Sequence, residues 1–277
     1  NMEKTELFKT IETQGNAAKD LLDEMNLRHS NALLIQETGQ AVAKILNVNR
    51  IMDTVVAMVQ KHLYFDRGMI MLADQDKRRL QFISGFGYTA DQEKILRGTA
   101  FDLDNDGSHG HFVRSFREQK PFLVRNVAEH ETDLSARSRE FVRQMGVQSF
   151  ICVPIIYEVE SLGVLVVENN RYHNNPAQSE ISLLMGVAAQ TATGIINARS
   201  FKRIQESERQ YRLLADNISD VIWVIDFSLS KFSYISPSVE RLQGFTPEEV
   251  LALDLSDILT PQSYEIALKT MTEELIR

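Results

Sequence analysis

Carboxylates at alternate positions form the most suggestive chemical pattern in the chain. Residues 102–107 read Asp-Leu-Asp-Asn-Asp-Gly, which matches the first half of an EF-hand calcium loop, where alternate oxygens ligate the ion and glycine permits the turn. The twelfth position of such a loop carries a bidentate glutamate, and here it is Val113. Because the strongest ligand is missing, the pattern favours a solvated loop at the mouth of a pocket over a metal site, although His109 and His111 lie close by in sequence.

A glycine-rich pattern precedes that loop. Residues 85–90 read Gly-Phe-Gly-Tyr-Thr-Ala between a predicted strand and a predicted helix, which formally fits a dinucleotide-binding fingerprint. That mechanism requires the first strand of a parallel βαβ unit and an acidic residue at the end of the next strand. The strand here is instead the second of a hairpin, and residues 101–104 are too short and polar to supply the next one. These glycines are therefore predicted to serve turns.

Composition excludes several classes of protein. The formal charge is −8 and no Lys or Arg cluster is present, so no nucleic acid partner is expected. Cys152 is the single cysteine, which rules out an internal disulfide, and its apolar surroundings predict an inert, packed thiol. The longest uninterrupted apolar stretch, residues 150–157, is far shorter than the roughly 20 residues of a membrane helix. We therefore expect a cytoplasmic protein with no membrane segment in this chain.

No catalytic motif is recognisable. The chain contains no Walker A sequence, no zincin motif and no nucleophile elbow. His62, His130 and His173 form no spacing typical of a Ser-His-Asp triad. We expect no catalytic residues and no enzyme activity within these residues.

Hydrophobic periodicity predicts the elements that would position a site. The first part of the chain is expected to hold helices and a hairpin, at residues 3–45, 49–63, 68–73 and 79–83. Further elements follow as short helices and strands, at residues 91–96, 110–119, 122–124 and 136–145. Two near-continuous apolar strands, 149–156 and 162–168, imply cover on both faces. After a long helix at 179–216, two strands at 219–226 and 231–236 precede helices that begin at residues 237, 246 and 260.

Two apolar seams run along helices that are otherwise polar. Their members follow heptad-like steps, at Leu7, Ile11, Leu21 and Met25 in the first helix and at Phe201, Ile204 and Tyr211 in the long one. Such a seam is buried either on the helix's own domain or against a partner. We expect a homodimer through parallel helices.

Three stretches carry a family resemblance. Residues 111–127 read HFVRSFREQKPFLVRNV, residues 146–155 read GVQSFICVPI, and residues 162–167 read LGVLVV. In this order and spacing they resemble the helix, turn and strands of a GAF domain. Residues 211–226 and 234–250, YRLLADNISDVIWVID and YISPSVERLQGFTPEEV, resemble the first half of a PAS domain, whose last three strands are absent here.

The resemblance implies an α/β (α+β) fold class with a GAF-type antiparallel sheet flanked by helices. We divide the chain into an N-terminal signalling helix, a GAF domain, a coiled-coil linker and a partial PAS domain, at residues 1–29, 30–200, 201–216 and 217–277. GAF and PAS modules usually precede a histidine kinase or a diguanylate cyclase. The expected function is therefore sensory input in bacterial signal transduction, with a sensor histidine kinase of a two-component system as the favoured parent.

A small ligand or a partner surface would bind between the GAF sheet and the helices around Phe112 and Phe141. Pocket candidates share apolar bulk beside predicted loops and are Met69, Met71, Phe82, Phe112, Phe116, Phe141, Met145 and Phe150. The sequence requires no cofactor, and the ligand stays unknown. Cyclic nucleotide is weakly suggested by Asn170 and Arg171. A dimerisation scaffold with a filled pocket, the input region of a diguanylate cyclase, and a haem- or flavin-bearing redox sensor remain alternatives.

Overall fold

The computed structural model describes residues 2–105, 110–133, 135–169, 178–217, 220–226 and 231–275. The chain divides into two compact units, Asn1–Phe201 and Lys202–Arg277. Each unit is described by itself.

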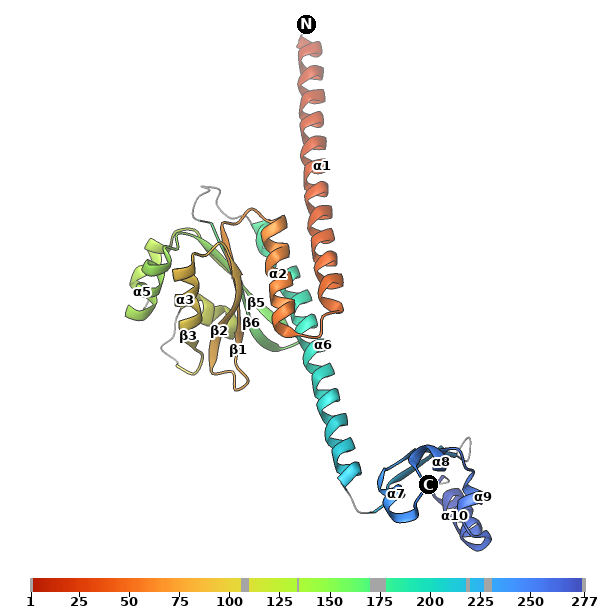
Figure 1. Cartoon of the computed structure of the whole chain (residues 1–277). Coiled ribbons are helices and arrows are strands. Elements are labelled where there is room, and N and C mark those ends of the chain that lie inside the picture. Colours follow the sequence, from red (N-terminus) through yellow and green to blue (C-terminus); the bar gives the residue numbers. More distant parts are fainter. Residues whose placement is uncertain are drawn as a thin grey trace. The chain divides into compact units, whose positions relative to one another are not determined.

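The first unit is built on an antiparallel sheet (Figure 1). Its described strands are β1 Arg67–Ala73, β2 Arg79–Phe86, β3 Ala100–Asp102, β4 Phe122–Val124, β5 Phe150–Tyr157 and β6 Glu160–Glu168. They lie in the order β3-β2-β1-β6-β5-β4. The expected mixed fold with an antiparallel sheet is confirmed. Strand β3 was not predicted, because it is only three residues long and is defined by its pairing with β2.

Helices cover both faces of this sheet. On one face lie α2 Val48–His62 and the first half of α6 Gln178–Asn217, joined by the C-terminal part of α1 Met2–Ala43 (Figure 1). The opposite face carries α3 Ala90–Gly98, α4 His111–Glu118 and α5 Ala136–Met145. A 3-10 helix, η1 Val127–Asp133, connects β4 to α5 and was not predicted.

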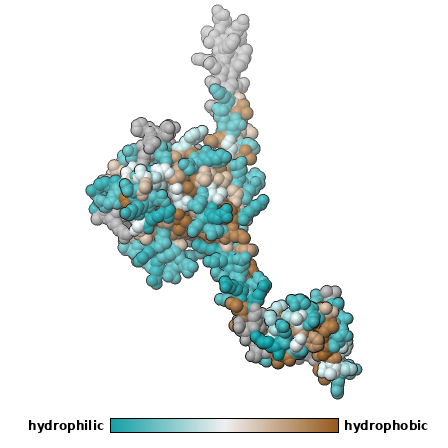
Figure 2. Space-filling view, viewed as in Figure 1, coloured by the Kyte–Doolittle hydropathy of each residue, from teal (hydrophilic) through white to brown (hydrophobic). Residues whose placement is uncertain are grey.

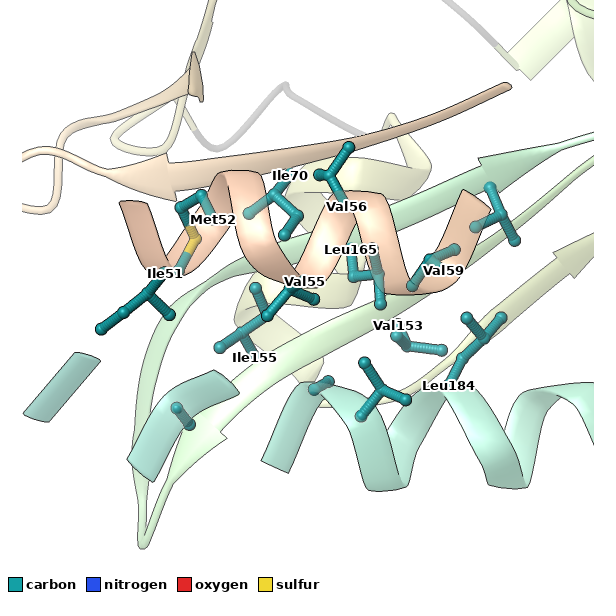
Figure 3. Packing of buried hydrophobic residues seen from close by; sticks show 14 of the residues in the cluster. Ile51, Met52, Val55, Val56, Val59, Ile70, Val153, Ile155, Leu165 and Leu184 are labelled. Carbon is teal, nitrogen blue, oxygen red and sulfur yellow. The ribbon is translucent and has the colours of Figure 1, made fainter. Parts of the chain in front are cut away.

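Strand alternation divides the apolar residues between two cores. Ile70 and Leu165 project into the core against α2 and α6, where Val55 and Leu184 meet them (Figure 3). Neighbouring strand residues such as Met69 project to the other core, under α3, α4 and α5. Because successive side chains in a strand point to opposite faces, a strand covered on both sides becomes apolar throughout. This is the reason for the continuous apolar runs in β5 and β6.

Helix α1 packs against α6 at two glycines of α6. A Cβ added to Gly186 on α6 would collide with the side chain of Ile35, and one on Gly194 would lie 3.0 Å from Val42. Glycine therefore allows the two helices to approach closely over residues 34–42 of α1.

Helix α6 changes character along its length. Ala188, Ala192 and Ile195 are buried in the core, whereas Phe201 and Ile204 are exposed. Its segment Ser179–Leu214 is long and apolar enough by composition to cross a membrane, but more than half of its most apolar window is buried inside the protein. Burial of this kind is typical of a helix in the core of a folded domain.

The second unit holds a two-stranded antiparallel sheet of β7 Trp223–Asp226 and β8 Lys231–Ile235. Four described helices follow, α7 Ser238–Gln243, α8 Pro247–Leu251, α9 Leu255–Ile258 and α10 Pro261–Leu275. A capping box between Thr246 and Glu249 starts α8, as its sequence predicts. The small core contains Ile235, Val239 and Val250. Strand β7 is shorter than expected, and α9 was not predicted.

Candidate functional site

A cavity of about 300 Å³ lies on the side of the sheet covered by α4 and α5. This volume is at the lower end of the range of small-molecule sites. Its described lining comes from the β3 region, the start of α4, β4, η1, α5 and β5, and consists of Thr99, Ala100, Phe101, Asp102, Asn105, Gly110, His111, Phe112, Val113, Val124, Val127, His130, Ser135, Ser138, Phe141, Val142, Val147 and Phe150. Elements far apart in sequence thus enclose one space.

Aromatic rings in edge-to-face contact form much of the wall. Phe101 contacts Phe112 and Phe141, with ring centroids 5.3 and 5.2 Å apart. Phe112 in turn contacts Phe150 at 5.7 Å. Such pairs hold each other in fixed orientations, so this apolar wall is preformed.

Two histidines stand beside the aromatic wall. The rings of His111, on the first turn of α4, and His130, in η1, lie 5.5 Å apart between centroids. His111 also contacts the rings of Phe150 and Phe122. Both imidazoles are partly buried and line the cavity.

The helices on either side of the cavity begin at it. Gly110 is the N-cap of α4 and provides no side-chain cap. Ser135 is the N-cap of α5, and its Oγ accepts a hydrogen bond from the Ser138 backbone N–H at 3.1 Å. Both N-caps line the cavity. The N-terminal N–H groups and the helix dipole add partial positive charge at this corner.

Asn105, in the described part of the loop after β3, lines one side of the cavity. Arg117 on α4 holds this loop by donating hydrogen bonds from Nε to the Leu103 carbonyl at 3.2 Å and from Nη2 to the Asn105 carbonyl at 3.0 Å. Asp102, the one acidic residue among the described lining residues, accepts a hydrogen bond from the Asp104 N–H at 2.9 Å. The Asp102 carboxylate therefore already accepts a hydrogen bond within the loop.

The structure brings together only part of the predicted pocket set. Phe112, Phe141 and Phe150 line the cavity. The other members are buried in the apolar cluster on the same side of the sheet without lining it, and are Met69, Met71, Phe82, Phe116 and Met145. The size and apolar character of a side chain do not tell whether it lines the cavity or lies in the apolar core next to it.

The polar members of the site were missed by sequence reasoning. His111 was considered only beside a weak metal motif, and His130 only as a candidate for a catalytic triad. For His111 the available signal was its place at the start of the helix predicted at residues 110–119, beside an aromatic-rich segment, whereas His130 lies outside every predicted element. Ser135 had the weaker signal of a helix N-cap.

A buried ion pair lies at the end of β1 and β6 on the same side of the sheet. Arg67 and Glu168 are directly paired in the antiparallel register, with Nη2 and Oε2 2.6 Å apart, and their side chains are 8% and 1% exposed. Arg67 Nη1 also donates to the Met145 carbonyl at the end of α5, at 2.7 Å. Tyr88 donates its hydroxyl to Glu168 Oε1 at 3.0 Å. The pair therefore anchors one end of a helix that lines the cavity.

Burial dominates the electrostatics of this cluster. Desolvation raises the pKa of Glu168 above its usual value, against the lowering effect of Arg67 and of the Tyr88 hydrogen bond. Desolvation and then the Glu168 charge raise the pKa of Tyr88 well above its usual value. Sequence reasoning missed this cluster, since nothing in the local pattern indicates that residues 67 and 168 meet.

Cys152 lies inside β5 and is fully buried. Burial raises the pKa of its thiol to about 12, and the Ser115 hydrogen bond only partly opposes this. A thiol in that environment is inert.

No group of three or more His, Cys, Asp or Glu side chains able to hold a metal is found within the described ranges. Part of the suggested calcium loop, residues 106–109, lies outside them, as do Asn170 and Arg171. Asp104 in the described part of the loop pairs with Arg78 at 3.5 Å.

The predicted seam residues lie mostly on exposed helix surface. Leu21, Met25, Phe201, Ile204 and Tyr211 are between 40% and 71% exposed. Brown, apolar residues interrupt the polar surface along these parts of α1 and α6 (Figure 2). The side chains of Leu7 and Ile11 lie outside the described residues.

The family model of the GAF domain matches residues 47–195, more than half of the chain, and the chain belongs to this family. Nitrogen fixation protein AnfA of Azotobacter vinelandii is 25% identical over 161 residues, which are 57% of this chain and 28% of that protein. The Nif-specific regulatory protein of Herbaspirillum seropedicae is 25% identical over 195 residues, 69% of this chain and 34% of that protein. The chain thus spans about a third of these relatives' length.

Solved structures share this fold. The GAF domain of a phosphoenolpyruvate-protein phosphotransferase from Coxiella burnetii is 17% identical and superposes with a TM-score of 0.52, covering 63% of this chain and 98% of that one. At this identity the likeness is one of fold. Together these comparisons show a GAF domain that is similar in sequence to part of a Nif-specific regulatory protein.

Proposed function

We propose that this chain is the non-catalytic sensory input region of a cytoplasmic bacterial signalling protein, and that its GAF domain binds a small ligand. The cavity of about 300 Å³ beside α4 and α5 carries this proposal. It combines an apolar aromatic wall with a few polar groups in one corner, which is the usual composition of a small-molecule site. The similarity to the Nif-specific regulatory protein of Herbaspirillum seropedicae supports a regulatory role.

Ligand binding would be transmitted by helices α1 and α6, which would shift between two packing arrangements. Helix α6 is buried in the sheet core at Ile195 and emerges with exposed Phe201 and Ile204. Helix α1 packs tightly on α6 at Gly186 and Gly194, so a movement of one helix displaces the other. In a parallel homodimer the exposed seams of both helices would be buried, and their rotation or register would carry the signal.

The second unit would receive that signal as a partial PAS domain. Its two strands and following helices have the order expected for the first half of a PAS fold. We propose a sensor histidine kinase of a two-component system as the parent protein, with a diguanylate cyclase as the alternative. Reading the same gene beyond Arg277 tests this: a phosphoacceptor histidine with an ATP-binding domain indicates the kinase, and a Gly-Gly-Asp/Glu-Glu-Phe motif the cyclase.

A thermal-shift screen of small metabolites on the full chain tests ligand binding. Binding in the cavity predicts a compound that raises the melting temperature of the wild type but not of Val147→Trp, which fills the cavity. Val159→Trp is the matched control, because Val159 is 87% exposed in the turn between β5 and β6. A compound that stabilises the wild type and both variants equally would bind outside the cavity. No stabilising compound at all would favour the scaffold alternative.

Light scattering tests the dimer. We expect a dimer at tens of micromolar protein, and partial or complete dissociation in Ile204→Glu, because a charge in the seam opposes its burial. Gln210→Glu introduces the same charge outside the heptad positions of the seam on α6 and should remain dimeric. A strict monomer of the wild type would refute this part of the proposal.

A further inference from the structure

Four phenylalanines of the cavity lining present ring surface to a ligand. Phe101, Phe112, Phe141 and Phe150 all line the cavity, and together they form what we call the phenylalanine wall. Phe101 and Phe112 are only partly buried, so part of their ring surface stays in contact with water. Because exposure of apolar surface to water is unfavourable, a ligand that covers these rings gains free energy on binding.

The geometry of the phenylalanine wall favours an aromatic ligand over other apolar ones. Phe101 meets Phe112 and Phe141 with the ring planes at 84° and 89°. Phe112 meets Phe150 at 65°. In such edge-to-face clusters the positive edge of one ring contacts the negative face of the next, and a flat ligand ring continues this pattern. A saturated ring of the same size retains only the burial of apolar surface.

The Ser138 hydroxyl is able to donate a hydrogen bond to such a ligand. Ser138 lies in the first turn of α5, is half-buried and lines the cavity. Its Oγ accepts a hydrogen bond from Ser135 Oγ at 3.0 Å. A hydroxyl that accepts one hydrogen bond can still donate its own proton, so Ser138 can donate to a ligand oxygen.

The charges of the described lining favour an uncharged ligand. The only formally charged side chain among these residues is that of Asp102, which is exposed to solvent and accepts the Asp104 N–H at 2.9 Å. Thr99, Ser138 and His130 provide hydroxyl and imidazole groups, which form hydrogen bonds without a formal charge. An ion would exchange its hydration for a wall of phenylalanines and neutral polar groups, which costs far more than burying a hydrogen-bonded neutral group.

We propose that the cavity binds a neutral aromatic compound of one ring that carries a hydrogen-bonding oxygen, as a phenol does. The ring lies against the phenylalanine wall, and the oxygen accepts a hydrogen bond from the Ser138 hydroxyl. This rests on the proposed function, in which the cavity is the ligand site, and adds the chemical class of the ligand. The volume of about 300 Å³ is at the lower end of the range of small-molecule sites, which suits a single ring.

Isothermal titration calorimetry of the full chain at pH 8 tests the class with single-ring probes of similar size. The proposed kind of ligand is para-cresol, whereas para-methylcyclohexanol lacks the aromatic ring and toluene lacks the oxygen. The probes para-toluate and para-methylbenzylamine carry a negative and a positive charge. At pH 8 an imidazole of ordinary pKa is neutral and a phenolic hydroxyl keeps its proton, so the charges of the comparison are defined.

We expect para-cresol to be the tightest binder of the series. Aromatic contact should favour it about fivefold over para-methylcyclohexanol. The hydrogen bond should favour it about fivefold over toluene. The cost of burying a charge should favour it about tenfold or more over para-toluate and para-methylbenzylamine. Val147→Trp, which fills the cavity, should bind none of these probes.

Two substitutions with matched controls locate the ligand. Ser138→Ala should weaken para-cresol binding about fivefold and leave toluene binding unchanged, and it keeps the N-cap hydrogen bond of α5, which uses the Ser138 backbone N–H. Ser182→Ala is its control, because Ser182 is exposed on α6 and does not line the cavity. Phe101→Leu should reduce the preference for para-cresol over para-methylcyclohexanol to about twofold or less. Phe116→Leu should keep that preference, because Phe116 belongs to the same apolar cluster without lining the cavity.

The outcomes separate the ligand class from the proposed function. Equal or tighter binding of toluene, of the saturated alcohol or of a charged probe overturns the neutral aromatic class, but leaves the cavity as a ligand site if Val147→Trp abolishes that binding. Unchanged para-cresol binding in Ser138→Ala, with circular dichroism showing a folded variant, overturns the assigned position of the oxygen. Failure of every probe to bind overturns the class, and the proposed function then depends on the metabolite screen alone.

Discussion

The buried pair of Arg67 and Glu168 yields the sharpest quantitative prediction. Their Nη2 and Oε2 atoms are 2.6 Å apart, and both side chains are more than nine-tenths buried. Arg67→Met leaves the Glu168 carboxylate buried without its cation and leaves the Met145 carbonyl without its donor. Removing one partner of a buried pair costs about 3–5 kcal/mol, so we expect a loss of about 4 kcal/mol in the free energy of unfolding.

A second substitution shows whether the stability lost in Arg67→Met comes from the unpaired buried carboxylate or from lost packing. Arg67→Met combined with Glu168→Leu removes both charges and keeps apolar volume at the end of β1 and β6. Exchanging a buried pair for apolar residues is often neutral. We therefore expect the double variant to regain about 2 kcal/mol or more relative to Arg67→Met.

Urea unfolding of the full chain, followed by circular dichroism, measures these changes. With a denaturant slope of about 2 kcal/mol per M, a loss of 4 kcal/mol moves the midpoint of the GAF transition by about 2 M. The chain's single tryptophan, Trp223, lies in the second unit, so its fluorescence follows a transition that should not move. Lys77→Met is the matched control, since its pair with Glu160 spans 2.8 Å but is about half exposed, and should cost about 0.5 kcal/mol.

Two results would refute the reasoning. One is a shift for Arg67→Met as small as that for Lys77→Met, which would mean that water reaches the pair. The other is a double variant no more stable than the single one, which would assign the loss to packing and to the hydrogen bond with Met145.

Three further predictions follow from single residues. Because burial raises the pKa of Glu168 in the folded state, its contribution to stability is full below about pH 4.5 and is lost as the pH rises through the raised pKa. The stability of the wild type relative to Glu168→Gln should therefore fall as the pH rises above about 4.5 in urea titrations, and a constant or rising difference would contradict this. Cys152, with its thiol pKa raised to about 12, should resist iodoacetamide at pH 8 in native protein and react once urea unfolds the domain; labelling at the unfolded rate without urea would be incompatible with its burial. Gly87 and Gly146 both have a left-handed φ, of 79° and 62°, but only at Gly87 would a Cβ strike a backbone atom. Gly146→Ala should cost about 1 kcal/mol, and Gly87→Ala should lower the melting temperature clearly more. Equal shifts would show that the backbone conformation, and not the steric collision, determines the cost of both substitutions.

Most of the fold was predicted from strong hydrophobic periodicity along the chain. Strand β4 matches the predicted residues 122–124, and β5 and β6 differ from theirs by one or two residues at their ends. Long apolar runs and helix caps are local properties of the chain, so they are readable without knowing what they pack against. Of the missed elements, β3 and α9 are three and four residues long, too short to show a period, and η1 is a seven-residue 3-10 helix without an apolar period of its own.

Of the residues predicted around a pocket, some line the cavity and others do not. Phe112 and Phe141 were expected around a pocket, and both line the cavity. Met69 and Phe82 were expected beside them and are core residues instead. Which apolar side chain faces a cavity depends on the positions of several elements at once, and the sequence of any one element does not contain this information.

The sequence by itself determined most of the helices and strands, that the sheet is covered on both faces, and that the chain has the GAF order of elements, because these depend on local periodicity and spacing. Only the tertiary structure decided that His111 meets His130 beside a phenylalanine wall and that Arg67 meets Glu168 at the end of the sheet. Such encounters join residues 19 to 101 positions apart through sheet register and helix packing, and they leave no pattern along the chain.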